Sequence, residues 1–400
     1  MNRNGTGAAV REIMQDYARL TGLSPAGVHP KRYLWTDAFA VCNYLELFRQ
    51  TSDGSFRDLG LRLIHQVHHI LGRHRVEGPR SGWISGLDEQ EGERHPTRGG
   101  LRIGKQLDER KEEEPPDERM EWDQDGQYYH YLTKWMHALN RAGQVAGDPT
   151  YTLWAIELAK TAHARFTYVS PSGGGKRMYW KMSIDLTRPL VLSMGQHDPL
   201  DGFVTYSELQ AAAARYFGEL QPLDLDSEIA EMAEICRRIS FTTDDPLGIG
   251  GLLFDGSRIA QLMIQDVSRE ANPPRWPGLA SLLETVLNSA LMGVESFANS
   301  ETLAYTADHR LAFRELGLSI GLSTVESLQK WIEENPNLFQ RKNRLSLLVE
   351  DLMEYVPLGD QIEQFWMNDG NREAGTWIEH REINMVMLAT SLAPVSFLMI

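Results

Sequence analysis

The segment DQDGQYYHYLTKWMHAL at residues 123–139 decides the predicted fold, because acidic and aromatic residues stand directly before an apolar helical run. Similar phrases recur along the chain: WTDAFAVCNYLEL at 35–47, HDPLDGFVTYSEL at 197–209, DDPLGIGGLLFDG at 244–256, TADHRLAFRELGL at 306–318 and REAGTWIEHREINM at 372–385. Self-similarity at long spacing is typical of repeat architectures. If these helix starts share one end of a closed ring, their polar and aromatic side chains converge there.

Each phrase begins a predicted pair of helices. The predicted pairs are 35–48 with 56–71, 126–142 with 149–166, 204–217 with 227–239, 247–267 with 278–297, 309–332 with 342–355, and a less regular one from 358 to the end. In the first pair the two helices are separated by a turn at Ser52-Asp-Gly54, and in the second pair by a turn at Gly147-Asp-Pro149. The pattern predicts an all-α chain of about twelve paired helices plus an N-terminal helix at 8–20. Strand signals are confined to a small hairpin between 167–169 and 177–182.

We expect one domain over 1–400, because a closed helical ring needs all its pairs in a single unit. The longest connection between pairs is 72–120, and a stretch of that length inside a compact domain is usually functional or disordered. Its later part, 108–118, reads DERKEEEPPDE and predicts a solvated or mobile face. Its earlier part, 78–105, is rich in Gly, Trp and Arg and predicts ordered structure.

Composition narrows the class of protein. Hydrophobic residues make up 42% and charged residues 24%, which is ordinary for a globular chain with an ample core. The net charge of -15 argues against nucleic acid as a partner, because the phosphate backbone would be repelled. We expect a small-molecule or oligosaccharide substrate and no nucleic-acid partner. The oligomeric state stays open, and a homo-oligomer is compatible with the sequence.

The termini and cysteines predict a cytoplasmic protein. Residues 1–10 lack the apolar core of a signal peptide. The tail 385–400 is apolar but short and contains Pro394, so we expect a buried closing helix and no membrane association. Cys42 and Cys236, both in apolar helical patterns, are predicted to be buried thiols.

Paired helices with acids, histidines and aromatics at their starts, as in Trp35-Thr-Asp37 and Asp123-Gln-Asp-Gly126, resemble the six-hairpin glycosidase-like enzymes. This superfamily has an (α/α)6 barrel, or toroid, and includes glycoside hydrolases, unsaturated glucuronyl hydrolases and the N-acylglucosamine 2-epimerase family. The resemblance extends from about Tyr33 to the end of the chain. It implies a sugar-sized pocket, with long loops at one end of the barrel.

Glycoside hydrolysis requires a pair of carboxyl groups, one acting as acid and the other as base or nucleophile. Asp125 is the leading candidate, since it stands at a predicted helix start, where it could also simply cap the helix. The predicted partner is Asp37, Asp123 or Asp185. The substrate-binding candidates are Trp35, Trp122, Trp180, His130, Asp198, Arg98, Arg102 and Arg188: the indoles would stack on sugar rings and the guanidinium groups would hold an acidic substituent.

Two histidines support an alternative reaction. His197 precedes Asp198 in a Gly- and Pro-rich segment, and His380 lies in the polar run Glu379-His-Arg-Glu382. Because imidazole titrates near neutral pH, a facing pair would suit proton abstraction and return in a sugar epimerase or isomerase. Surface or salt-bridged histidines would give the same pattern.

His65 and His69 have the i, i+4 spacing that can place two imidazoles on one metal, within IHQVHHIL at 64–71. No HExxH motif is present, so the sequence favours a packed or solvated histidine stripe, and we expect neither a metal nor another cofactor. The leading function is hydrolysis of a glycosidic bond, with a sugar epimerase and a non-enzymatic helical repeat binding protein as alternatives.

Overall fold

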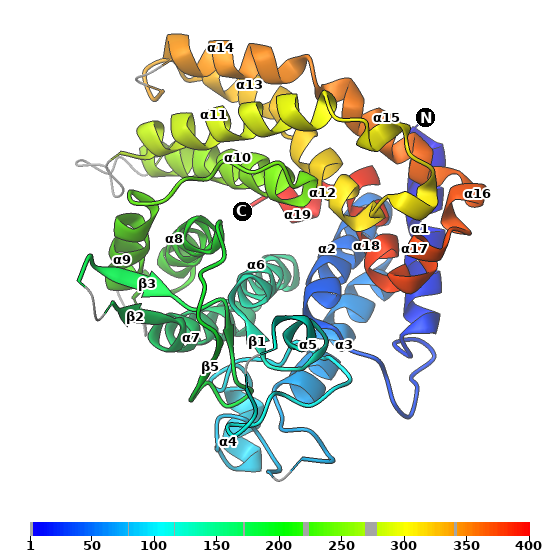
Figure 1. The fold of residues 1–400 in the computed structure, drawn as a ribbon, viewed down its shortest axis with the longest axis vertical. Helices are drawn as coiled ribbons and strands as arrows, with labels where there is room; N and C mark the ends of the chain where they lie inside the picture. The colour runs from blue at the N-terminus through cyan, green and yellow to red at the C-terminus, as the bar shows by residue number, and fades with distance from the viewer. Residues whose placement is uncertain are drawn as a thin grey trace. The chain divides into compact units, whose positions relative to one another are not determined.

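The computed structural model describes residues 3–78, 80–115, 117–170, 173–218, 224–268, 278–339 and 342–400. The chain forms two compact units, one of residues 15–239 and the other of residues 1–14 with 240–400, so the division falls inside helix α1 (Arg3–Leu20). Both units consist mainly of helices, which confirms the all-α class (Figure 1). The single domain expected from the sequence stays a prediction.

The 15–239 unit is built from three helix hairpins. Their helices are α2 (Leu34–Thr51) with α3 (Gly54–Leu71), α6 (Tyr129–Ala146) with α7 (Pro149–Phe166), and α8 (Asp198–Phe217) with α9 (Asp226–Cys236). The predicted turns are confirmed: Asp53 and Asp148 cap α3 and α7 by accepting backbone N–H groups, and Gly147 ends α6 with φ +66°. α6 packs against both α2 and α8, so these three helices form an inner row (Figure 1).

The inner helices are buried along nearly their whole length, polar residues included, so each buried polar group needs a partner. Buried polar groups on α6 find partners on α8. Lys134 Nζ donates to Asp201 at 2.6 Å, two turns before Asn140 Nδ2 donates to Glu208 at 2.7 Å. His137 also contacts Glu208, at 2.9 Å. These contacts form a polar ladder that fixes how far α6 can slide along α8.

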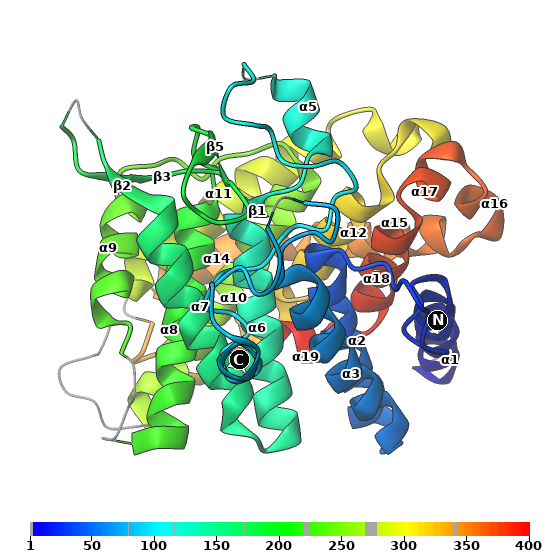
Figure 2. The ribbon, with the colours of Figure 1, turned by 90° about the horizontal axis from the view of Figure 1, so that it is seen from below.

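Short strands and one small helix cover the end at which α6 begins. The strands are β1 (Gln127–Tyr128), β4 (Lys181–Met182) and β5 (Pro189–Val191) in one antiparallel sheet of order β1-β4-β5, and β2 (Thr167–Val169) and β3 (Lys176–Met178) in a hairpin. The hairpin confirms part of the prediction; residues 181 and 182 instead pair with β1 and β5. Figure 2 shows β1, β5 and helix α5 (Glu118–Asp123) at this end of the unit.

The connection 72–120 contains helix α4 (Glu89–Arg94) and α5. Its earlier part is ordered as predicted apart from Pro79, which lies outside the described residues. Arg102 N–H donates to Leu71 O and Ile103 N–H donates to Gly126 O, so this segment is pinned between α3 and β1. Pro116, within the charged run, lies outside the described residues.

The other unit contains ten further helical elements among its described residues beyond position 240. They are α10 (Pro246–Ser268), α11 (Leu279–Ala298), α12 (Ala312–Leu322), α13 (Val325–Glu334), α14 (Lys342–Met353), α15 (Val356–Met367), α16 (Asp369–Arg372), α17 (Gly375–Glu379), α18 (Arg381–Leu392) and α19 (Val395–Leu398), with 3-10 turns η2 (Thr302–Ala304) and η3 (Ala307–His309). α10 packs on α11 and α12, and α12 packs on α15 and α18.

Two helices predicted in this unit are divided. The predicted helix 309–332 is interrupted: one helix ends at Leu322 and the next begins at Val325. Between them the hydroxyls of Ser323 and Thr324 donate to carbonyl oxygens of the preceding turn and so compete with the backbone hydrogen bonds of the helix. The predicted closing helix 385–400 becomes α18 and α19, with Pro394 between them. Arg258 and Gln261 of α10 donate to carbonyls of α19, which holds that helix against α10.

No helix in the described ranges carries an apolar stretch long enough to cross a bilayer. The two cysteines, Cys42 and Cys236, are buried and unbonded to each other, which confirms the prediction of buried thiols.

Glycines let α10 and α12 approach closely. A Cβ atom on Gly250 would lie 2.0 Å from the carbonyl oxygen of Gly317, and one on Gly321 would lie 2.6 Å from the Cα of Gly250. Neither neighbour can move without shifting a helix backbone. At the next residue, Gly251, a Cβ atom would meet only the ring of Phe254 within 4 Å, at 3.8 Å.

We therefore expect Gly250→Ala to destabilise the protein by about 1–3 kcal/mol, because the extra methyl overpacks the α10–α12 contact. Its matched control is Gly251→Ala, which should stabilise by roughly 0.5–1 kcal/mol, since alanine loses less backbone entropy than glycine in a helix. Urea denaturation followed by tryptophan fluorescence measures both changes. Equal effects of the two substitutions would contradict the close packing.

Candidate functional site

The starts of the three inner helices α2, α6 and α8 bring their side chains together, as the recurring phrases predict. Trp35 of α2 lies 6.0 Å from the ring of His130 on α6, measured between ring centroids. His130 Nδ1 lies 3.6 Å from Asp198 Oδ1 at the start of α8. An indole, an imidazole and a carboxyl group from three separate hairpins therefore meet at one place, which we call the His130 site.

Aromatic rings extend the His130 site on one side. Tyr128 stacks on His130 with centroids 5.4 Å apart, and Trp180 lies nearly parallel to His130 at 6.2 Å. Trp122, from α5, meets Trp180 edge to face at 4.8 Å and is 53% exposed. Lys181 holds this arrangement in place, because its ammonium group donates to the carbonyl oxygens of Glu121 and Gln124. The result is a row of rings running from a buried end to an exposed end.

Asp198 is a buried acid. Burial raises its pKa to about 8, and the nearby charge of Asp201 acts in the same direction. The carboxyl group therefore carries its proton at neutral pH. Gly195 makes room for it, since a Cβ atom there would lie 2.4 Å from Asp198 Oδ2. A glycine at this position is a requirement of the acid's placement.

His130 is a neutral imidazole next to this acid. Burial, together with the charge of Lys134, lowers its pKa to about 4. Its side chain is 26% exposed, so one edge of the ring faces solvent. Within the described part of the chain, His130 Nδ1, Asp198 Oδ2 and Trp35 Nε1 are buried without a hydrogen-bond partner. Buried polar atoms in native proteins are rarely left unpaired, so three in one site mark a place for a polar ligand.

Asp201 differs from Asp198 although it stands one helical turn later. Lys134 Nζ lies 2.6 Å from its Oδ2, and the hydroxyl of Thr133 donates to the same oxygen at 2.5 Å. A cation and a hydroxyl donor favour the charged form of Asp201. Two carboxyl groups in neighbouring turns of α8 thus stand in opposite environments, one favouring the protonated form and the other the ionised form.

Asp125, the leading candidate from sequence, lies in a closed network. Its side chain is 0% exposed, Arg102 contacts Oδ2 at 2.5 Å, and Arg75 contacts the same oxygen at 3.4 Å. Backbone N–H groups of residues 104, 105 and 126 donate to Oδ1. These five donors occupy both oxygens, which leaves no open position for a substrate. This geometry gives no support to the predicted acid–base role of Asp125.

Asp37 and Asp185 are also engaged locally. Asp37 is fully buried, accepts from Tyr17 at 2.5 Å and pairs with Arg32 at 3.2 Å. Asp185 closes the turn at 183–187: burial would raise its pKa, but hydrogen bonds from Thr187, Ser183 and Arg80 outweigh burial and lower it. Both environments account for these acids without a substrate.

The predicted anion-binding arginines have protein partners. The guanidinium of Arg102 donates to Asp125 and to the carbonyl oxygens of residues 70 and 73. Arg98 pairs with Glu157 at 2.9 Å. Arg188 donates to the carbonyl oxygen of Arg110 and is half-buried. Arg102 therefore fixes the 72–120 connection. In the described part of the chain, none of the three arginines has an interaction with a residue of the His130 site.

Asp123, His197 and His380 have different surroundings. Asp123 is exposed at the end of α5, next to Trp122, and its charge helps raise the pKa of Tyr128. His197 is the residue before α8 and so adjoins Asp198 directly. His380 precedes α18 in the other unit and packs against Phe313 at 5.5 Å. The two histidines are thus both at helix starts, but in separate units.

Several residues of the His130 site were not singled out by sequence reasoning. Thr133 and Lys134 are on the buried face of α6, and Tyr128 is in β1. Lys134 had a detectable signal, since a lysine inside an apolar helical run requires a buried acidic partner. Asp201 is an acid within the predicted helix start, three residues after Asp198, a spacing that could also have been noticed.

No protein-family model matches the chain, and no curated protein matches its sequence. Among solved structures, the chain is similar to the cellobiose 2-epimerase of Spirochaeta thermophila. The identity is 12%, the TM-score is 0.42, and the match covers 96% of this chain and 98% of that chain. A likeness at this TM-score says nothing about function, so the residues of the His130 site alone support a functional assignment.

If Asp125 has a structural role, removing its partner should unfold the protein more easily. We expect Arg102→Met to destabilise by about 3–5 kcal/mol, because a buried carboxylate would lose its main counter-charge. Arg94→Met is the matched control: Arg94 forms an exposed pair with Glu91, and such pairs contribute about 0–1 kcal/mol. Urea unfolding measures both; a small effect of Arg102→Met would contradict the role.

The pKa of Asp198 predicts a pH dependence of stability. In the unfolded chain Asp198 loses its proton near the usual aspartate pKa of about 3.9. In the folded protein it keeps the proton up to about pH 8. The contribution of Asp198 to the free energy of unfolding therefore falls as pH rises through this window. Asp198→Asn should remove this loss, so its melting temperature relative to wild type should rise between pH 5 and pH 8. Parallel curves, as expected for the exposed-site control Asp58→Asn, would refute the protonated state.

Proposed function

We propose that the chain is a carbohydrate-active enzyme that binds a saccharide along the aromatic row of the His130 site and acts on it with Asp198 as proton donor. The observation that carries this proposal is the group of three unpaired buried polar atoms of Trp35, His130 and Asp198. They lie beside stacked rings and next to a carboxyl group that keeps its proton at neutral pH.

The aromatic row supports a sugar in preference to a flat or charged ligand. A pyranose ring presents C–H groups on its faces and hydroxyl groups at its rim. Trp180 and Trp122 offer ring faces or edges for the C–H groups, and the unpaired atoms of His130 and Asp198 can bond hydroxyls. A saccharide would thus satisfy both the apolar and the polar parts of the site.

Hydrolysis of a glycosidic bond is the leading reaction. It needs a protonated acid to assist departure of the leaving oxygen, and the raised pKa of Asp198 is what that role demands. The second carboxylate of this proposal is Asp123, which is exposed at the edge of the row and close enough to Tyr128 for its charge to act on that phenol. Asp201, with its Lys134 partner, would hold α8 and its charge would keep Asp198 protonated.

Epimerisation of a sugar is the second candidate, and one feature favours it. His130 is a neutral imidazole 3.6 Å from a protonated acid. Such a pair could remove the proton next to a sugar carbonyl while the acid protonates the carbonyl oxygen. His197, which adjoins Asp198, is a further base within the same unit.

Proton and carbon NMR in D2O separates the two reactions. The protein would be incubated with a panel of oligosaccharides and free sugars; new reducing ends indicate hydrolysis, and a new monosaccharide carrying deuterium without bond cleavage indicates epimerisation. We expect Asp198→Asn to lower turnover at least about 100-fold, the usual contribution of a positioned acid. The rate kcat/KM should fall above about pH 8, where Asp198 loses its proton.

The control variant is Asp58→Asn, an exposed acid of α3 that pairs with its neighbour Arg57 at 2.9 Å and should leave turnover unchanged. Full activity of Asp198→Asn would exclude Asp198 as the acid. Sugar binding detected by tryptophan fluorescence without turnover would instead favour a non-enzymatic binding protein. If the protein neither binds nor turns over any sugar of the panel, the proposed function is refuted.

A further inference from the structure

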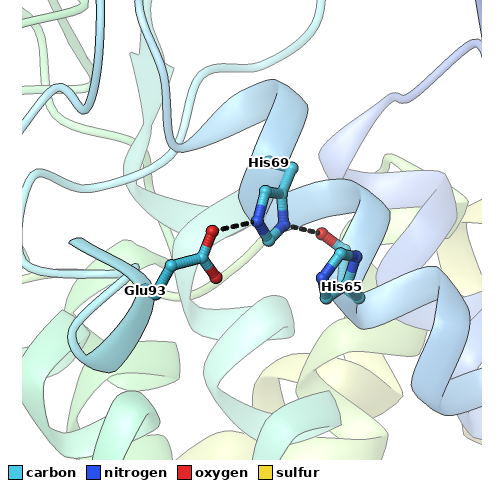
Figure 3. A group of neighbouring side chains, drawn as sticks. All are labelled: His65, His69 and Glu93. Atoms are coloured by element: carbon cyan, nitrogen blue, oxygen red, sulfur yellow. Dashed lines mark hydrogen bonds and ion pairs between the residues drawn. The ribbon is translucent and has the colours of Figure 1, made fainter. Parts of the chain in front are cut away.

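His65 and His69 of α3 and Glu93 of α4 form a compact group away from the His130 site (Figure 3). The two histidines are one helical turn apart, and their rings stack with centroids 3.9 Å apart. Glu93 arrives from a different part of the chain, and one ligand atom from each residue lies within 4.8 Å of the other two. The group therefore has three donor atoms that a single ion can reach.

His69 is placed between two acceptors. Its Nδ1 lies 2.8 Å from the backbone carbonyl oxygen of His65, and its Nε2 lies 2.5 Å from Glu93 Oε1. A carbonyl oxygen can only accept, so Nδ1 carries hydrogen and the lone pair of a neutral ring is on Nε2, toward the carboxylate. Nε2 and Glu93 Oε1 therefore face each other at 2.5 Å, and a metal ion between them would bond to both. A carbonyl on the far nitrogen is the usual support of a metal-binding histidine.

We propose that His65, His69 and Glu93 bind one divalent transition-metal ion, with Zn2+ as the representative species. Two imidazoles and one carboxylate, with a fourth position left open, form a known class of zinc site. Imidazole ligands select zinc, copper, nickel or iron and disfavour magnesium and calcium, which prefer oxygen. This metal site is independent of the proposed sugar chemistry.

Small side-chain movements complete the coordination. Metal–nitrogen and metal–oxygen distances of about 2.0–2.2 Å in a tetrahedral site separate ligand atoms by about 3.3–3.6 Å. His69 and Glu93 would move apart slightly from 2.5 Å to admit the ion, and His65 would rotate inward. All three residues are partly or largely exposed, so rotation meets little resistance. Arg73, 3.9 Å from Glu93, already pairs with Glu89 and need not be displaced.

The ion would fasten helix α4 to helix α3. α4 is only six residues long and lies within the 72–120 connection. Gly92 in α4 packs so closely on the indole of Trp83 that a Cβ atom would lie 2.2 Å from the ring. A pocket lined by Leu61, Ile64, Tyr151 and Trp154, among others, borders the three ligands and leaves space for a water molecule on the fourth position.

The test uses the full chain without any histidine tag, stripped with a chelator and titrated with Zn2+ by calorimetry at pH 7.5. We expect one equivalent to bind with micromolar affinity or better, and Co2+ to give the visible absorption of a four-coordinate site. His69→Ala and Glu93→Gln should each weaken binding by at least about 10-fold, as ligand or supporting-residue losses do. Limited proteolysis within 72–120 should slow when Zn2+ is present.

His29→Ala is the matched control, because His29 is an exposed histidine outside the group and should bind Zn2+ like the wild type. His65→Ala serves as a third ligand variant whose exposed side chain puts folding at little risk. No binding tighter than about 100 μM, far weaker than the usual structural zinc site, would overturn the proposal. So would Zn2+ binding that all three ligand variants leave unchanged, since the ion would then be held elsewhere.

Discussion

The polar ladder between α6 and α8 is the constraint on which the rest of the 15–239 unit depends. Its rungs, Lys134 with Asp201 and Asn140 with Glu208, are two helical turns apart on both helices. Breaking one rung would leave a buried charge or amide unpaired, and the penalty for that is larger than the gain from any alternative register. The ladder therefore fixes the height of His130 beside Asp198, and a slide of one residue would separate them.

Environment, and not residue type, divides the acids of this unit by role. Asp125 and Asp37 are surrounded by donors and are committed to holding backbone segments together. Asp198 is buried beside a like charge, so it keeps its proton. The same side chain thus serves as an anchor in a donor-rich place and is suited to be a proton donor in a donor-poor one.

The sequence predicted the hairpins of the 15–239 unit well because each turn carried its own chemistry, as Gly147-Asp-Pro149 does between α6 and α7. It also located the helix starts at which Trp35, His130 and Asp198 meet. It could not rank the acids, since Asp125 meets its partners Arg75 and Arg102 only after the 72–120 connection folds back. The division at Ser323 and the Glu93 contact to His69 likewise depend on tertiary structure.

The network around Asp125 divides the 72–120 connection into a part that the fold constrains and a part that can change in sequence and length. Residues 102–105 are tied to one carboxylate and to β1, so their spacing is set by the fold. Residues 111–114 are exposed and charged, and none of their described contacts reaches Asp125. Insertions or segments grafted from another protein at the exposed part should leave the anchor intact. The protein can thus acquire new surface loops beside the aromatic row while the packing of its core stays unchanged.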